Sequence, residues 1–127
     1  MNKKKGKKPR FVVDADLYYK DFKDKYKKKA RFYSVTETIG RTSNVEDLEI
    51  FEKCVNTKKH IITQNYEHFK KIKKSKPHTN VGIVGICSQH YSKAIDQFGN
   101  VLKFYRSHTD FKGKLIGVTS TKYEENK

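Results

Sequence analysis

The chain has 127 residues, a length that suits one domain, and its 29 lysine and arginine residues outnumber 14 acidic ones, giving a formal net charge of +15. Apolar residues make up 35% of the sequence, so we expect one modest hydrophobic core. The excess positive charge favours a polyanionic partner, and we expect nucleic acid. An anionic membrane, an acidic protein, or a lysine-rich composition without functional meaning are the alternatives.

Two cysteines are too few for a disulfide-rich fold, and Cys54 and Cys87 lack the spacing of metal ligands. We expect both to be buried thiols in a reducing compartment. No apolar run approaches the ~18 residues of a membrane helix, and the basic N-terminus lacks the apolar stretch of a signal peptide. The sequence therefore predicts a soluble, cytoplasmic protein with no membrane partner.

The first ten residues are rich in lysine and contain nothing that can bury apolar surface, so we expect residues 1–10 to form a disordered basic arm. Beyond them, short apolar runs typical of buried strands alternate with the three-to-four-residue spacing of amphipathic helices. The predicted elements, in chain order, are a strand at 11–13, a helix at 17–30, a strand at 31–35, a loop at 38–44, a helix from the Ser43–Glu46 capping box onward, a strand at 60–63, a helix at 66–74, a strand at 81–87, a helix at 91–106, a strand at 115–119 and a polar tail at 121–127.

Strands that alternate with helices imply crossover connections, and hence parallel pairing. The sequence predicts an α/β domain over residues 11–120, with three layers and a mostly parallel central sheet of about five strands flanked by helices. There is no internal repeat and no sign of a second domain.

Acidic and amide side chains follow the ends of two predicted strands, and ligands of open parallel sheets bind at that edge. Asp14 and Asp16 follow the first strand, Asn65 and Glu67 follow the third, and Asp47 lies in the first turn of a helix that begins at the same edge. Clustered carboxylates repel one another unless a cation lies between them, and Mg²⁺ or Mn²⁺ prefers such oxygen ligands. We therefore expect a metal site formed by these five residues, with Asp14 and Asp47 catalytic, that hydrolyses a phosphodiester.

Each of these residues also has an ordinary structural explanation. Asp14 can start a turn, Asp16 can cap a helix, Asp47 can favour the helix dipole, and Asn65 can form an Asx turn. Basic residues flank the same edge and are predicted to guide nucleic-acid phosphates, although a solvated surface explains them equally simply. These predicted nucleic-acid-binding residues are Lys20, Arg41, Lys70, Lys71, Lys73 and Lys74.

Four segments of the chain, FVVDADL, SNVEDLEIF, HIITQNYEHF and VGIVGIC, resemble the PIN-like domain family over roughly residues 11 to 120. Members include ribonuclease toxins of toxin–antitoxin pairs and stand-alone PIN-like proteins. Asp14 and Asp47 match two of the family's acidic positions, and Glu37 is a looser match to a third. Ala15 stands where many stand-alone members have Glu, and His68 stands at a position that is acidic in the family.

The resemblance implies a PIN-like fold, a Mg²⁺- or Mn²⁺-dependent ribonuclease activity, a possible protein antitoxin and a possible homodimer. A non-catalytic nucleic-acid-binding module on the same fold is the main alternative. Asp14-Ala15-Asp16 also fits the D-x-D start of haloacid-dehalogenase-type phosphatases, but the chain is small and lacks a late Asp-Asp pair. A response-regulator receiver is a further alternative, although its paired acids and strand-ending lysine are not evident.

Overall fold

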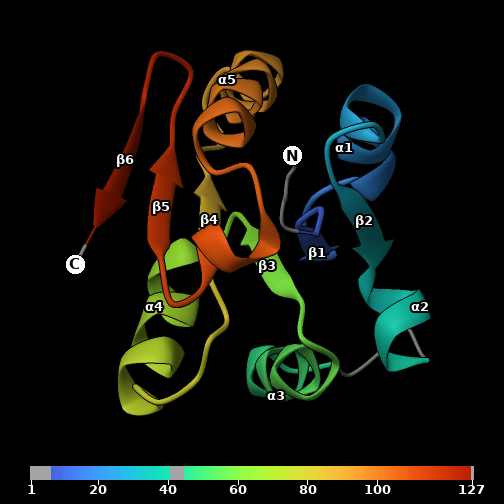
Figure 1. Cartoon of the computed structure of the whole chain (residues 1–127), viewed down its shortest axis with the longest axis vertical. Helices are drawn as coiled ribbons and strands as arrows, with labels where there is room; N and C mark the ends of the chain where they lie inside the picture. Colours follow the sequence, from blue (N-terminus) through green and yellow to red (C-terminus); the bar gives the residue numbers. More distant parts are fainter. Residues whose placement is uncertain (1–6, 41–44, 127) are drawn as a thin grey trace, which may run out of the picture.

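The structure, a computed structural model, describes residues 7–40 and 45–126 (Figure 1). Short strands alternate with helices along the whole of this part of the chain. The elements are β1 (Arg10–Val13), α1 (Tyr19–Tyr26), β2 (Arg31–Ser34), α2 (Val35–Ile39), α3 (Asp47–Thr57), β3 (His60–Thr63), α4 (Tyr66–Ser75), β4 (Ile83–Ile86), α5 (Tyr91–Phe104), the short 3₁₀ helix η1 (His108–Phe111), β5 (Leu115–Val118) and β6 (Tyr123–Asn126).

The strands of the described chain form one sheet in the order β2-β1-β3-β4-β5-β6. The first five are parallel to their neighbours, whereas β6 runs antiparallel to β5. The α/β class and the mostly parallel sheet are therefore confirmed. The sheet has six strands rather than the expected five or so, because the chain turns back after β5 and adds an antiparallel edge.

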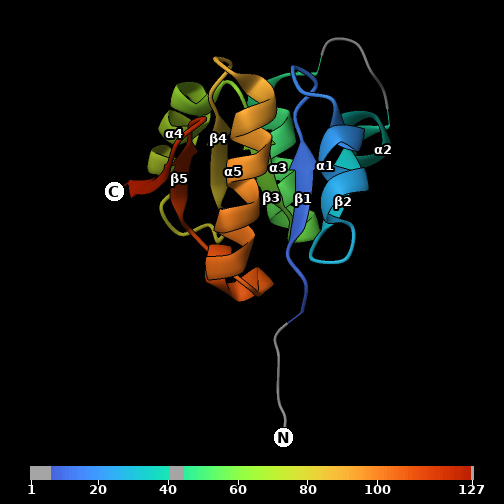
Figure 2. The same ribbon diagram turned by 90° about the horizontal axis from the view of Figure 1, so that it is seen from above.

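Two apolar layers lie on opposite faces of the sheet because successive strand residues point in opposite directions. In β1, Phe11 and Val13 pack into the layer that contains α1 and α5, whereas Val12 packs into the layer that contains α2, α3 and α4. Figure 2 shows α5 and α1 in front of the strands and the other helices behind. The sheet thus lies between two layers of helices, and its central strands β3 and β4 are buried on both faces.

One crossover differs from the others in its handedness. The chain passes from β3 to β4 through α4 on one face, and then onward in the same direction from β4 to β5 through α5 on the opposite face. This last crossover therefore has the opposite hand to the earlier ones, an arrangement that parallel sheets rarely contain. As a result, α5 covers β4 and β5 on the same face of the sheet where α1 covers the strands at the opposite end, near β2.

Part of the expected loop at residues 38–44 is helical, and the second strand ends earlier than predicted. Ser34 accepts a hydrogen bond from the Glu37 amide at 3.1 Å, and the Glu37 carboxylate accepts one from the Ser34 amide at 2.8 Å. This capping box starts α2 directly after β2. The predicted capping box at Ser43 lies outside the described residues, and α3 begins at Asp47 without a side-chain cap from Glu46.

The two ends of the described chain are more structured than the sequence suggested. Residues 7–10 belong to the expected basic arm, but the Pro9 carbonyl accepts from Arg31 N at 2.9 Å and the Lys7 carbonyl accepts from His108 N at 2.8 Å. Residues 123–126, expected within a polar tail, form β6. The rest of the expected arm, residues 1–6, lies outside the described residues.

Candidate functional site

The strand order places one point on the carboxyl edge of the sheet where a ligand is expected. From β1 the chain passes to β2 on one side, and later returns to β3 on the other side of β1. The helices that follow these two strands diverge to opposite faces, which leaves a crevice beyond the strand ends. Asp14 follows β1 and Thr63 ends β3, so both lie at this switch point.

Asp14 lies at the bottom of the site and is only 7% exposed. Its Oδ1 accepts from the Ala15 amide at 2.8 Å, and its Oδ2 accepts from the Thr63 hydroxyl at 2.7 Å. Burial raises the pKa of Asp14 above its ordinary value, because these two hydrogen bonds replace only part of the lost hydration. Asp14 therefore carries a charge that a nearby cation would stabilise.

Asp47 reaches the same edge from the first turn of α3. Its Oδ2 accepts from Asn65 Nδ2 at 2.7 Å and lies 2.6 Å from His68 Nδ1. Asn65 follows β3 directly, and His68 lies in the first turn of α4, so this contact joins α3 to the β3–α4 connection. The predicted convergence of Asp47 and Asn65 is thus present as a direct hydrogen bond.

Asp16 completes the carboxylates at this edge. Burial raises its pKa, and repulsion from Asp14 and, more weakly, from Asp47 raises it further. Its Oδ1 accepts a long hydrogen bond of 3.4 Å from the Gln64 amide. We refer to Asp14, Asp16 and Asp47 as the acidic group. The charges of Asp14 and Asp47 contribute to the raised pKa of Asp16, and the charge of Asp47 contributes, after burial, to the raised pKa of Asp14.

The donor atoms of the acidic group are of the type that Mg²⁺ and Mn²⁺ prefer, namely carboxylate oxygens with an amide oxygen nearby at Asn65. The repulsion that raises the pKa of Asp16 is what a bound cation would relieve. Within residues 7–40 and 45–126, no set of three or more His, Cys, Asp or Glu side chains is close enough to hold a metal ion as it stands. The donors therefore fit a divalent cation in kind, and binding would require them to approach one another.

Other predicted site residues lie elsewhere. Glu67 points toward Lys70, with 3.5 Å between the charged atoms, and is exposed on α4. Lys70 also lies over the Tyr66 ring, 5.0 Å from its centroid. Lys73 is buried, and burial lowers its pKa. Lys20, Lys71 and Lys74 are exposed on α1 and α4.

Two other residues named from the sequence, Arg41 and Glu37, are not among the described residues at the acidic group. Arg41 lies outside the described residues. Glu37, the looser family match, is occupied in the capping box of α2 and is exposed. It forms no contact with the acidic group in the described part of the chain.

Three features of the site were not identified as site contacts from the sequence. Thr63 donates its hydroxyl to Asp14 and also accepts from the Asn65 amide at 2.8 Å. The Gln64 backbone contacts Asp16, and His68 contacts Asp47. The Thr-x-Asn sequence at the end of β3 is a usable signal for Thr63, because a threonine hydroxyl at that position can reach the residue that follows β1.

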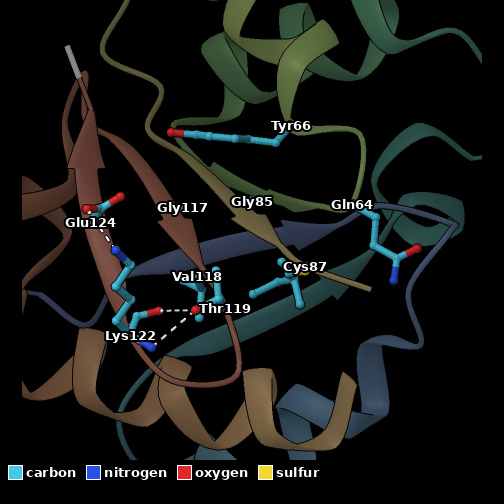
Figure 3. Close-up of a pocket in the computed structure, with 10 residues that line it drawn as sticks. Gln64, Tyr66, Gly85, Cys87, Gly117, Val118, Thr119, Lys122 and Glu124 are labelled. Carbon is cyan, nitrogen blue, oxygen red and sulfur yellow. Dashed lines mark hydrogen bonds and ion pairs between the residues drawn. The ribbon is translucent and has the colours of Figure 1, made fainter. Parts of the chain in front are cut away.

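A pocket of about 200 Å³ continues this edge toward β5 and β6 (Figure 3). Gln64 lies at the side nearest the acidic group, and Tyr66, Cys87 and Lys122 line the remainder. The Tyr66 ring lies against Gly85, where an added Cβ would come within 2.3 Å of it. The glycine therefore allows the aromatic ring to lie flat over β4 beside the site.

The fold and the acidic group together define a three-layer α/β protein with a carboxylate-lined edge at its topological switch point. No protein-family model, curated protein or solved structure matches this chain. In the described residues, no helix has the length and apolarity that a membrane crossing requires.

Proposed function

We propose that this protein is a PIN-like, Mg²⁺- or Mn²⁺-dependent nuclease that hydrolyses phosphodiester bonds, in RNA rather than DNA, at the acidic group. The observation that supports the proposal is that Asp14, Asp16 and Asp47 lie at the same edge of a parallel sheet, near its switch point, with Asn65 hydrogen-bonded to Asp47. The net charge of +15 supports a polyanionic substrate. The resemblance to the PIN-like family adds a toxin-like role, a protein antitoxin and a homodimer as possibilities for this protein.

In this proposal Asp14, Asp16, Asp47 and Asn65 would hold the cation. The chemistry that such an ion supplies is polarisation of a phosphodiester oxygen and acidification of a water molecule. Thr63 fixes the orientation of the Asp14 carboxylate through its 2.7 Å hydrogen bond. His68, hydrogen-bonded to Asp47 and half exposed, can hold or transfer a proton at the rim of the site.

The test compares cleavage of structured RNA and of a DNA of the same sequence by the wild type, Asp14→Asn and Asp47→Asn, in Mn²⁺, in Mg²⁺ and in chelator. We expect cleavage only of RNA and only with a cation, and a loss of at least about 100-fold in both variants. Asp24→Asn, which removes an exposed carboxylate from α1, is the matched control and should cleave normally. Cleavage that persists in chelator or in Asp14→Asn would contradict the proposal.

Thermal unfolding supplies a second readout that does not depend on finding the correct substrate. Mn²⁺ should raise the melting temperature of the wild type and of Asp24→Asn, because a ligand that binds only the folded state stabilises it. Asp14→Asn should show no such rise. Equal shifts in all three proteins would place the cation elsewhere on the molecule.

A non-catalytic nucleic-acid-binding module is the second candidate. The charge excess favours it, because binding through lysines does not require the acidic group. It predicts binding that weakens steeply with salt, that survives Asp14→Asn, and that leads to no cleavage with any cation.

A further inference from the structure

A second and larger cavity, of about 1070 Å³, lies at the amino edge of the sheet, opposite the acidic group. We call it the basic cleft. Cations reach it from the segment before β1, the start of β2, the α3–β3 connection and the segment after η1, and no Asp or Glu is among the described residues that line it. The cations that define it are Lys7, Lys8, Arg31, Lys58, Lys59 and Lys112.

Some lysines of the described chain pair with carboxylates, but the cations of the basic cleft are not among them. Outside the cleft, Lys25 pairs with Asp96 at 2.6 Å, and Lys114 pairs with Glu125 at 3.2 Å. Within the described part of the chain, no ion pair joins a carboxylate to any cation of the basic cleft. The cleft therefore concentrates positive charge that the protein itself leaves uncompensated.

The walls of the cleft are held by hydrogen bonds between distant segments. Arg10 donates to the Thr57 and Lys58 carbonyls at the end of α3, at 3.2 and 3.0 Å. The backbone amide of Arg10 donates to His108 Nδ1 at 3.1 Å, and the His108 carbonyl accepts from His60 Nε2 at 2.9 Å. Because these contacts tie β1, α3, β3 and η1 together, the cations on these segments are presented in a fixed arrangement.

The lowered pKa of His108 is consistent with the crowding of cations around the basic cleft. Burial lowers the pKa of His108, and Arg10, Lys112 and Lys7 lower it further. The groups that face its ring are the stacked His60 imidazole, 4.1 Å away between centroids, and these cations. A positive potential thus fills the cleft.

We propose that the basic cleft binds the phosphate backbone of nucleic acid, as a site separate from the acidic group. An anionic chain is the ligand that such a row of uncompensated cations recognises, and its binding releases counterions. Among the described residues, the cleft lining contains no Tyr, Phe or Trp on which bases could stack, so contacts to the backbone, without sequence preference, carry the binding. The proposal does not rest on cleavage and stands whether or not the acidic group is catalytic.

The test measures fluorescence anisotropy of a labelled 12-nucleotide oligouridylate in chelator, with the double variant Lys58→Glu/Lys112→Glu. Both lysines are exposed and form no ion pair in the described structure, so folding should be retained, and circular dichroism and thermal unfolding verify this. The matched control Lys23→Glu/Lys103→Glu changes the net charge equally on the exposed faces of α1 and α5. If the glutamates prevent folding, Lys58→Gln/Lys112→Gln replaces them.

We expect the cleft variant to bind at least tenfold more weakly, and the control to change by less than threefold. The slope of log K against log salt should become shallower by about 1.4 in the cleft variant, as for the loss of two phosphate contacts on a single strand. Because the binding is measured in chelator, where the proposed nuclease is inactive, this result is separate from a failure of the proposed nuclease. Equal weakening in the cleft variant and the control would overturn the proposal.

Three competitors distinguish the sources of phosphate. Unlabelled oligouridylate should displace the probe, whereas uridine monophosphate at the same phosphate concentration should not. Displacement by inorganic polyphosphate at lower phosphate concentrations than by the oligonucleotide would overturn the assignment of nucleic acid as the occupant.

Discussion

Asp14 carries a carboxylate that the fold removes from water without a cationic partner among the described residues. Its folded-state pKa is raised by burial, so the folded protein binds a proton more readily than the unfolded chain does. Stability is therefore greatest below the unfolded pKa and falls as pH rises through the folded pKa. At neutral pH the charge of Asp14 destabilises the protein, as is common for residues kept for function.

The consequence can be measured with Asp14→Asn, which keeps the shape of the side chain and removes the charge. We expect the variant to be more stable than the wild type at pH 7.5, by about 1 kcal/mol, and the difference to shrink toward pH 3 as Asp14 becomes protonated. Thermal or urea unfolding at the two pH values checks this, with Asp24→Asn as the control. A less stable variant at pH 7.5 would show that the hydrogen bond from Thr63 outweighs the burial of charge.

His60 is a second buried titratable residue, and its effect has the opposite dependence on pH. Burial lowers the pKa of His60 to about 3, while its Nδ1 accepts from the Gly82 amide at 2.8 Å. A depressed folded-state pKa means that the neutral ring contributes stability above the unfolded value of 6.5, and that this stability is lost as pH falls from 6.5 toward 3. The neutral form is also the one that can accept from Gly82.

A pH titration by NMR tests this directly. We expect the ring signals of His60 to show no protonation between pH 7 and 4.5 while the protein stays folded. Urea unfolding over the same range should show stability that declines with acid. A titration of His60 near pH 6.5 in the folded protein would contradict the buried, neutral assignment.

The candidate site could be predicted in part, because strand ends and first helical turns are visible in the sequence. Asp14 follows an apolar run and Asp47 opens a helix, and the parallel topology then places them at one edge. The contacts of Thr63 and His68 could not be predicted, because they depend on side-chain directions and on how α3 and α4 meet. Glu67 illustrates the same limit. It was predicted to bind the metal, but it pairs with Lys70, whereas the next residue on α4, His68, contacts Asp47.

At the scale of elements, those with apolar periodicity were predicted and the polar or very short ones were not. β3 lies over the predicted residues 60–63, because its two isoleucines, Ile61 and Ile62, pack into the apolar layers on opposite faces of the sheet. α2 has five residues and depends on one capping box, and β6 consists of polar residues whose pairing with β5 decides their conformation. Such elements are set by tertiary contacts rather than by local pattern.

Gly99 lies inside α5, where glycine lowers helix propensity, and the packing of α1 against α5 explains its presence there. The Tyr26 hydroxyl donates to the Ile95 carbonyl at 2.6 Å, and its ring lies over Gly99. A Cβ at position 99 would lie 2.9 Å from the Tyr26 hydroxyl oxygen. The glycine thus allows the close approach of the two helices that cover one face of the sheet.

We expect Gly99→Ala to destabilise the protein by about 1–2 kcal/mol, because overpacking against Tyr26 outweighs the gain in helix propensity of about 1 kcal/mol. Asn100→Ala, at the exposed neighbouring position, is the control and should change stability by less than about 0.5 kcal/mol. Urea unfolding of the three proteins provides the comparison. A stabilised Gly99→Ala would mean that α1 can move away from α5 at little cost.

At the scale of the whole molecule, charge is divided between the two edges of the sheet. The acidic group lies beyond the carboxyl ends of the strands and the basic cleft lies at their amino ends. Four-residue strands separate these edges by roughly 13 Å, which exceeds the screening length of about 8 Å at physiological salt. The cleft cations therefore do not neutralise the acidic group through solvent, and each edge can hold a ligand of its own sign.

The reversal of direction at β6 has a practical consequence for experiments on this protein. Because β6 runs against β5, it ends at Asn126 beside Leu115, at the same edge where β1 begins. Lys7 lies in the basic cleft itself, whereas β6 is four strands away from β1, about 19 Å across the sheet. A surface or fluorophore attached beyond Asn126 would thus leave the carboxylate-lined edge facing solution, while a fusion placed before Lys7 would crowd the opposite one.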